Sequence, residues 1–216
     1  MRQEYKQKIN SRKGKPHAVF IDLKSAFDNV NWERLIKKLL GYRYPMSIIN
    51  SIRIMYQNAH ATPVDLKYAT KIKKGVLQGG ILSPMLFSLY INDLAVELDK
   101  IGEIKSYFYA DDLAMIIRGK RNINKALTII EDWSKRNMMG VNNKKCGIMK
   151  LAKRPINKAK GDVKNNKVQI MDSYPLVEEY KYLGISFNQD LSVKTHLIKM
   201  EEKLKKFKKR IYIHRV

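Results

Sequence analysis

With 216 residues, 44% of them hydrophobic, the chain can bury the core of one main domain without disulfides or structural metals. Lysine and arginine number 43 against 20 aspartate and glutamate, and the net charge of +23 favours nucleic acid as partner, although solvated basic faces would give the same count. The single cysteine excludes an intramolecular disulfide, and no signal peptide or apolar run of transmembrane length is present, which predicts an intracellular protein of nucleus or cytoplasm without a membrane partner.

The first predicted elements are a strand and two helices. Ala18 to Leu23 is a short apolar run that predicts a buried strand, with Asp22 at its end. Asn31 can cap a helix whose apolar residues recur at helical spacing before Gly41 stops it. A second helix is expected after Pro45.

The middle of the chain predicts paired strands, then a loop and a long helix. Thr62 to Val76 alternates polar and apolar residues, as paired strands do. Ser83 and Pro84 are suited to begin a helix, which places Gln78 to Leu82 on a loop. A further helix is expected to end at Gly140.

Two adjacent acidic residues interrupt the most apolar part of the sequence. Tyr107 to Ala110 and Leu113 to Ile117 predict a tight hairpin, with Asp111 and Asp112 between the strands. Adjacent carboxylates beside a buried sheet repel each other unless cations neutralise them. An aspartate pair at the solvent end of a sheet is the simpler interpretation of the dipeptide taken alone.

Asp22 changes that interpretation, because it ends another strand of a chain expected to bind polyanions. Phosphoryl transfer to a 3′-hydroxyl needs carboxylates that hold two Mg²⁺ roughly 4 Å apart. Mg²⁺ takes its remaining ligands from water and substrate phosphates, so no histidine or cysteine cluster is required.

Five stretches, in order, resemble the reverse transcriptase domain of non-LTR, LINE-type retrotransposons. The first, AVFIDLKSAFDNVNWERL, resembles the motif that presents a metal-binding aspartate, here Asp22. The resemblance makes Phe27 the steric gate, an aromatic ring that excludes the 2′-hydroxyl of an NTP by a clash. Without the resemblance, the simpler interpretation of Phe27 is an aromatic residue of the core.

The second and third stretches resemble the nucleotide pocket and the catalytic hairpin. GVLQGGILSPMLFSLYIND places Gln78 and Gly79 where the family lines the pocket for the template base and incoming nucleotide. YFYADDLAMII matches the Tyr-Ala-Asp-Asp hallmark, which implies that Asp111 is the second metal ligand and Asp112 a supporting acid. Asp22, Asp111 and Asp112 would bind two Mg²⁺ ions, for which Mn²⁺ can substitute.

The last two stretches resemble motifs near the leaving group and the primer. MMGVNNKKCGIM aligns Lys145 with a basic residue near the pyrophosphate, although family members more often have threonine or serine in place of Cys146. Solvated lysines are the alternative. EYKYLGISF resembles a hairpin that grips the primer, with Tyr182, Leu183 and Gly184 at its centre.

The fold implied is α+β, a right-hand polymerase palm with an antiparallel sheet packed on helices. Residues 1–15 are expected to be a basic segment ending a largely missing fingers region, and 16–190 to be the palm. Residues 191–216 form a basic amphipathic helix that begins a truncated thumb, its apolar side on the palm, or that binds a partner. Residues 152–167 read as a surface loop.

The resemblance implies an RNA-directed DNA polymerase whose partners are an RNA template, a DNA primer and dNTPs. Two alternatives stay open from the sequence. One is a catalytically dead, truncated remnant that only binds nucleic acid, and the other is a protein related to the maturases of group II introns.

Overall fold

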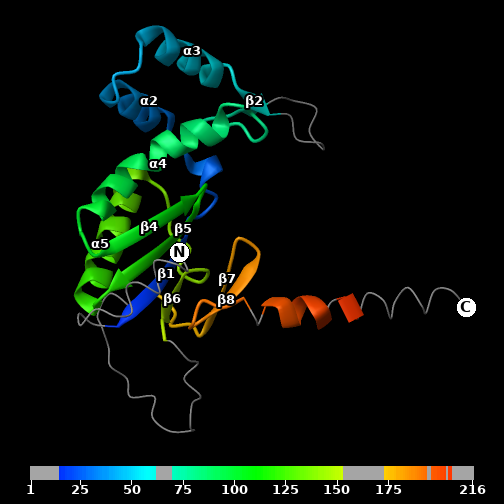
Figure 1. The fold of residues 1–216 in the computed structure, drawn as a ribbon. Coiled ribbons are helices and arrows are strands. Elements are labelled where there is room, and N and C mark those ends of the chain that lie inside the picture. Colours follow the sequence, from blue (N-terminus) through cyan, green and yellow to red (C-terminus); the bar gives the residue numbers. More distant parts are fainter. Residues whose placement is uncertain (1–14, 62–69, 153–172, 194–195, 203, 206–216) are drawn as a thin grey trace, which may run out of the picture.

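A four-stranded antiparallel sheet forms the centre of the fold, with strand order β4-β5-β1-β6 (Figure 1). The computed structural model describes residues 15–61, 70–152, 173–193, 196–202 and 204–205. The strands of the sheet are β1 (Pro16–Asp22), β4 (Ile104–Tyr109), β5 (Asp112–Arg118) and β6 (Gly147–Lys150). Because β1 pairs with both β5 and β6, segments far apart in the sequence meet at its edges.

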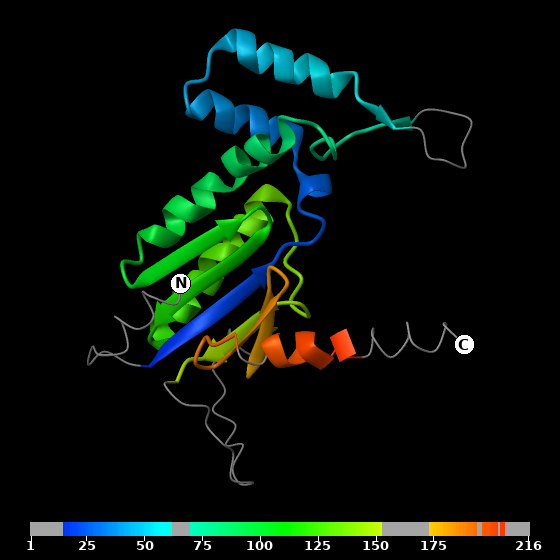
Figure 2. The ribbon, with the colours of Figure 1, turned by 45° about the vertical axis from the view of Figure 1, so that its right-hand side comes forward.

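Helices α4 (Ser83–Asp99) and α5 (Lys120–Asn137) cover one face of the sheet (Figure 2). Successive strand residues point to opposite faces, so Val19 and Ile21 of β1 join the core beneath these helices. Phe20, between them, belongs to a smaller cluster on the other face. The hairpin of β7 (Glu179–Tyr182) and β8 (Ile185–Asn188) covers that cluster in part, which explains why β1 is apolar on both faces.

A smaller helical layer lies at one end of the palm and packs on α4. It contains the short 3-10 helix η1 (Phe27–Asn29) and the helices α2 (Trp32–Gly41) and α3 (Met46–Gln57). The side chain of Asn31 accepts a hydrogen bond from the Arg34 backbone N–H at 3.0 Å, so the predicted cap is confirmed. Strands β2 (His60–Ala61) and β3 (Thr70–Lys71) pair beyond α3.

The strands expected over Thr62 to Val76 are therefore only partly observed. Pairing is seen at 60–61 and 70–71, while 62–69 lie outside the described residues. Residues 72–76 are not a strand, since Gly75 and Val76 instead donate backbone hydrogen bonds to the turn after β1. The predicted surface loop at 152–167 also falls almost wholly outside the described part.

The predicted helix end at Gly140 was wrong. The helix ends at Asn137, and Met138 takes the left-handed position with φ +54°, while the Met139 N–H closes the end on the Ser134 carbonyl. Gly140 has another role, because a Cβ there would lie 3.2 Å from Cδ of Lys24. Glycine thus allows the chain to pass close to the end of β1.

The helix predicted over residues 191–216 is seen in part, since 194–195, 203 and 206–216 lie outside the described residues, and its described apolar residues do not pack on the palm. Residues 196–202 and 204–205 are helical and project from the body (Figure 1). Leu197, Met200 and Leu204 are about half exposed, at 54%, 46% and 57%. Polar contacts attach the helix instead, since Lys199 pairs with Glu179 and His196 accepts from the Ser186 N–H. No helix among the described residues is long and apolar enough to cross a membrane.

A half-buried ion pair ties the helical layer to the palm helices. The ammonium of Lys38 on α2 contacts Asp93 of α4 at 2.8 Å and lies 4.3 Å from the ring centroid of Tyr90. The indole N–H of Trp133 on α5 donates to the same carboxylate at 2.7 Å. Asp93 therefore joins three helices through two charge-assisted hydrogen bonds.

Replacing Asp93 with alanine should lower the free energy of unfolding by about 2–3 kcal/mol, because Lys38 keeps its charge in a half-buried site without its partner. Chemical denaturation measured by circular dichroism checks this value. Asp132→Ala, at an exposed position of α5, is the matched control and should change stability by less than about 0.5 kcal/mol. Equal effects of the two substitutions would contradict the role given to Asp93.

Candidate active site

Two aspartates face each other across the centre of the sheet. Asp22 ends β1 and Asp112 begins β5, and the antiparallel register pairs them directly. Directly opposed residues point to the same face, so both carboxylates lie on the face that the helices leave uncovered, in line with Phe20. The predicted hairpin is present, but its turn lies one residue earlier than expected: Ala110, with φ +51°, and Asp111 form the turn, while Asp112 is the first residue of β5.

The three carboxylates act on one another electrostatically. Burial raises the pKa of Asp112, and the charges of Asp111 and Asp22 raise that pKa further. The positive charge of Lys145 works in the opposite direction. The predicted residues Asp22, Asp111, Asp112 and Lys145 thus lie in one electrostatic neighbourhood, and the ionised form of Asp112 is disfavoured there.

The backbone of Asp22 is held by the segment that follows α5. Its carbonyl accepts from the Asn142 N–H at 2.8 Å, and its N–H donates to Sγ of Cys146 at 3.4 Å. The thiol of Cys146 is buried, and burial raises its pKa to about 11, so it stays protonated at neutral pH. Cys146 is therefore a structural acceptor at the position where family members more often have threonine or serine.

The turn that contains Lys145 follows directly. The N–H groups of Lys145 and Cys146 both donate to the carbonyl of Asn142, at 2.8 and 3.1 Å. These hydrogen bonds close a tight turn just before β6 begins at Gly147. The turn carries the exposed cations Lys144 and Lys145, and the charge of Lys145 acts on Asp112.

Phe27 lies at the other end of the site, in η1 after β1. Its half-buried ring stacks on Phe87 of α4, with centroids 4.6 Å apart and planes 15° apart. Its carbonyl accepts from the Val76 N–H at 2.8 Å. The structure thus fixes Phe27 from two sides and leaves part of the ring accessible, in agreement with either a gate or a core aromatic.

Several hydrogen bonds join this turn to the loop before α4. Gly75 donates to the Val30 carbonyl at 2.8 Å, and Nε2 of Gln78 donates to Asp28 at 2.8 Å. Gly75 has φ +94°, and a Cβ there would lie 2.9 Å from the Asp28 carbonyl oxygen, so a larger residue would separate the two segments. Gln78 therefore sits beside the turn of Phe27.

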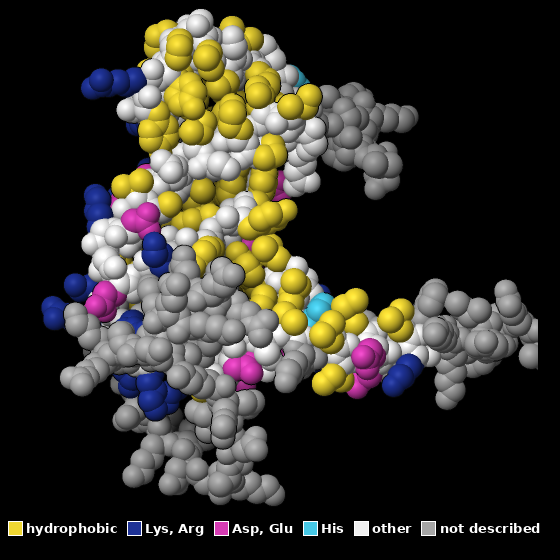
Figure 3. Space-filling view, viewed as in Figure 1, with side chains coloured by type: hydrophobic (Ala, Val, Ile, Leu, Met, Phe, Trp, Pro, Cys, Tyr) yellow, Lys and Arg dark blue, Asp and Glu magenta, His cyan; other side chains and the backbone are white. Residues whose placement is uncertain are grey.

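Gly79 forms the exposed tip of the same loop. Its φ is +82°, which glycine adopts without strain, and a Cβ there would meet no other atom within 4 Å. The backbone around Gly79 is thus open to an approaching ligand. Figure 3 shows the molecule hollowed on this side, between the α2 and α3 region and the 196–205 helix.

The predicted primer hairpin is confirmed in its geometry. Leu183 and Gly184 have φ of +48° and +80°, as a two-residue turn between β7 and β8 requires. Tyr182 points inward instead of toward the solvent, since it is only 9% exposed and packs 5.7 Å from Phe20, centroid to centroid. The exposed tip consists of Leu183, at 45%, and Ile185, at 38%.

The carboxylates fit a divalent cation bound together with substrate. Asp22 and Asp112 present hard oxygen donors on one face, and a cation there would relieve the repulsion that raises the pKa of Asp112. Within the described residues, no three acidic, histidine or cysteine side chains form a ready-made metal cluster. One or two carboxylates with substrate phosphates are the usual Mg²⁺ environment, so the donor set suits an ion that arrives with a nucleotide.

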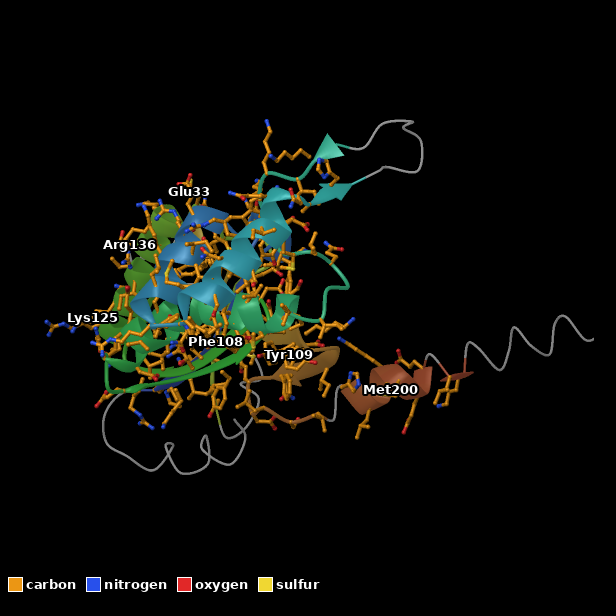
Figure 4. The ribbon with its side chains drawn as sticks, turned by 90° about the horizontal axis from the view of Figure 1, so that it is seen from above. Glu33, Phe108, Tyr109, Lys125, Arg136 and Met200 are labelled. Carbon is orange, nitrogen blue, oxygen red and sulfur yellow. The ribbon has the colours of Figure 1, made fainter. Side chains whose placement is uncertain are left out.

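Three contributing residues escaped prediction from the sequence. Asp28 orients Gln78, Asn142 bonds the backbone of Asp22, and Tyr180 donates to the Lys145 carbonyl at 2.6 Å. All three lie inside the quoted motifs, but only the fold shows what they contact. Figure 4 shows Tyr109 and Met200 on the hollowed side, and Lys125 and Arg136 on the opposite side.

Comparison with known proteins agrees with the geometry. Residues 1–187 match the family model described as reverse transcriptase (RNA-dependent DNA polymerase). The chain is 27% identical over 199 residues to a probable RNA-directed DNA polymerase from transposon BS of Drosophila melanogaster, covering 84% of this chain and 21% of that protein. It is 26% identical over 195 residues to a Pol polyprotein from the type-1 retrotransposable element R2 of Nasonia vitripennis, covering 80% and 18%.

Solved structures show the same fold. Apo telomerase from Candida tropicalis, truncated from its C-terminal domain, superposes with a TM-score of 0.64 at 19% identity, over 89% of this chain and 38% of that one. The chain spans about a fifth of the curated relatives it matches, at 21% and 18% of their lengths. The fold is thus a polymerase palm, the relatives are encoded by non-LTR retrotransposons, and this chain belongs to the reverse transcriptase family.

Proposed function

We propose that this chain is the catalytic palm of an RNA-directed DNA polymerase, which adds dNTPs to the 3′-hydroxyl of a DNA primer on an RNA template. The observation that carries the proposal is the register of the sheet, which pairs Asp22 with Asp112 and places Asp111 in the adjoining turn. The net charge of +23 supports a nucleic-acid partner.

Each predicted site residue has a role in this reaction. Asp22 and Asp111, with Asp112 beside them, would hold two Mg²⁺ ions, which activate the attacking 3′-hydroxyl and neutralise charge on the leaving pyrophosphate when bound. Lys145 would donate a proton to the pyrophosphate or neutralise its charge. Phe27, Gln78 and the backbone at Gly79 would line the nucleotide pocket.

Primer extension on an RNA template, with dNTPs and Mg²⁺, tests the proposal on the purified chain. We expect template-dependent synthesis that stops when EDTA removes the metal and that is absent from an Asp111→Ala preparation purified in parallel. Binding of a labelled template–primer is measured on both proteins. Binding without synthesis by the parent chain would refute the proposal and favour a protein that only binds nucleic acid.

A splicing assay distinguishes the proposed polymerase from a group II intron maturase. Adding the purified chain to a self-splicing intron under conditions of limiting Mg²⁺ should leave the splicing rate unchanged. Stimulated splicing without RNA-templated synthesis would contradict the proposed polymerase function.

A further inference from the structure

Tyr180 of β7 is locked in place between the hairpin and the sheet. Its ring stacks on Phe20, with centroids 4.1 Å apart and planes 6° apart. It also lies directly over Gly147 of β6, where a Cβ would approach ring atom Cδ2 to 2.8 Å. Glycine at 147 therefore makes room for the ring, and the position of Tyr180 is set by contacts on two strands of the palm.

The hydroxyl of Tyr180 reaches the turn that carries Lys145. It donates to the Lys145 carbonyl at 2.6 Å, a short hydrogen bond between residues 35 positions apart in the sequence. The same turn is closed by the N–H groups of Lys145 and Cys146 on the Asn142 carbonyl. Tyr180 thus anchors the turn to the β7–β8 hairpin, in addition to the bonds that the turn makes within itself and to Asp22.

The turn that carries Lys145 also holds the end of β1, where Asp22 lies. Regular pairing between β1 and β6 stops at Phe20 opposite Gly147, so the ladder does not extend to Asp22 on this edge. The Asn142 N–H and the Cys146 thiol supply the two missing backbone bonds of Asp22, at 2.8 and 3.4 Å. Asn142 and Cys146 therefore hold the backbone of Asp22, while the Tyr180 hydroxyl bonds the Lys145 carbonyl between them.

The phenol of Tyr180 is also close to the carboxylates themselves. Burial raises its pKa, and the charges of Asp22 and Asp112 add to the effect. The phenol consequently stays protonated and remains a hydrogen-bond donor at neutral pH.

We propose that Tyr180 is a positioning residue of the polymerase reaction, whose hydroxyl fixes the Lys145 turn so that the lysine side chain is aimed at the aspartate site. This inference rests on the proposed function. It couples the predicted primer hairpin mechanically to the leaving-group side of the site. Tyr180 itself need not touch primer or nucleotide.

Tyr180→Phe tests the inference, because it removes only the hydroxyl and keeps the ring on Phe20. We expect kcat for dNTP addition to fall about tenfold, the scale of a lost positioning contact. KM for dNTP, template–primer affinity and Tm should stay near the parent values. Tyr42→Phe is the matched control, since its hydroxyl also donates to a backbone carbonyl, that of Leu89, in the helical layer. It should leave kcat unchanged.

A double-mutant cycle shows whether Tyr180 acts through Lys145. Tyr180→Phe should have little further effect on single-turnover rates in a Lys145→Ala background, because the group that it positions is gone. Independent losses that multiply, an unchanged kcat for Tyr180→Phe, or a loss confined to template–primer affinity would each overturn the inference. Synthesis by the parent chain distinguishes these outcomes from failure of the proposed function, in which no protein would extend the primer.

Discussion

Asp22→Asn should reduce Mg²⁺-dependent dNTP incorporation by about a thousandfold or more, the scale of losing a principal charge-stabilising group. The backbone of Asp22 is held in place, because it is bonded to Asn142 and Cys146 and its strand neighbour is Asp112. Asparagine is nearly the same size, so the loss would arise from the charge. Single-nucleotide addition under single-turnover conditions measures the effect.

Asp112→Asn should stabilise the folded chain in the absence of metal. Its pKa is raised above the ordinary value of 3.8 by burial and by the charges of Asp111 and Asp22, so its ionised form destabilises the folded state. Asp112→Asn should therefore raise Tm in the absence of metal. The gain should appear as pH rises above about 4, become full above the raised pKa, and vanish at lower pH, where both folded and unfolded chains are protonated.

The change in Tm on adding Mg²⁺ tests the same carboxylates from the metal side. Bound cations should stabilise the parent chain with its template–primer and nucleotide, because they offset the repulsion among the carboxylates. The same addition should stabilise Asp22→Asn and Asp112→Asn less. Asp132→Ala, on the exposed side of α5, should respond as the parent does. An Asp22→Asn protein that keeps both full activity and the full Mg²⁺ response would remove Asp22 from the metal site.

Much of the local structure could be predicted from the sequence, because its causes are local. The Asn31 cap, the long helix begun by Ser83 and Pro84, and the hairpin between β4 and β5 follow from short-range backbone preferences, whereas the hairpin of β7 and β8 was expected from the motif resemblance alone. The end of α5 could not be predicted in this way. Met138 takes a left-handed conformation that glycine would ordinarily be expected to occupy, while Gly140 serves a tertiary contact with Lys24.

The arrangement of the site residues depends on pairing between strands that are distant in the sequence, which the spacing of apolar residues does not specify. The motif resemblance grouped Asp22 with the aspartate pair, but the partnership of Asp22 with Asp112 is a matter of strand register. Cys146 and Tyr180 make their contacts where the pairing between β1 and β6 ends. The sequences around these two residues do not show where that pairing ends. The sequence left open whether the apolar side of the 196–205 helix packs on the palm or binds a partner, and amphipathic spacing alone could not show that its described residues are exposed.

Phe27→Val should increase incorporation of NTPs relative to dNTPs by about a hundredfold, if the ring excludes the 2′-hydroxyl by a clash. The ring is well placed for this role, because Phe87 supports one face and the Val76 N–H holds its backbone. A supported ring cannot move aside when a ribonucleotide enters. Val keeps an apolar side chain against α4 but no longer reaches as far into the pocket.

The ratio of kcat/KM for an NTP to that for the matching dNTP is the decisive quantity, because it cancels any general loss of stability or template affinity. Phe27→Tyr is the conservative control, which keeps the bulk of the ring and should keep the parent ratio. If Phe27→Val lowered incorporation of both nucleotides equally, Phe27 would be a core aromatic that supports η1, and selection of the sugar would have to come from other residues. A rise confined to NTPs would place the ring beneath the sugar of the incoming nucleotide.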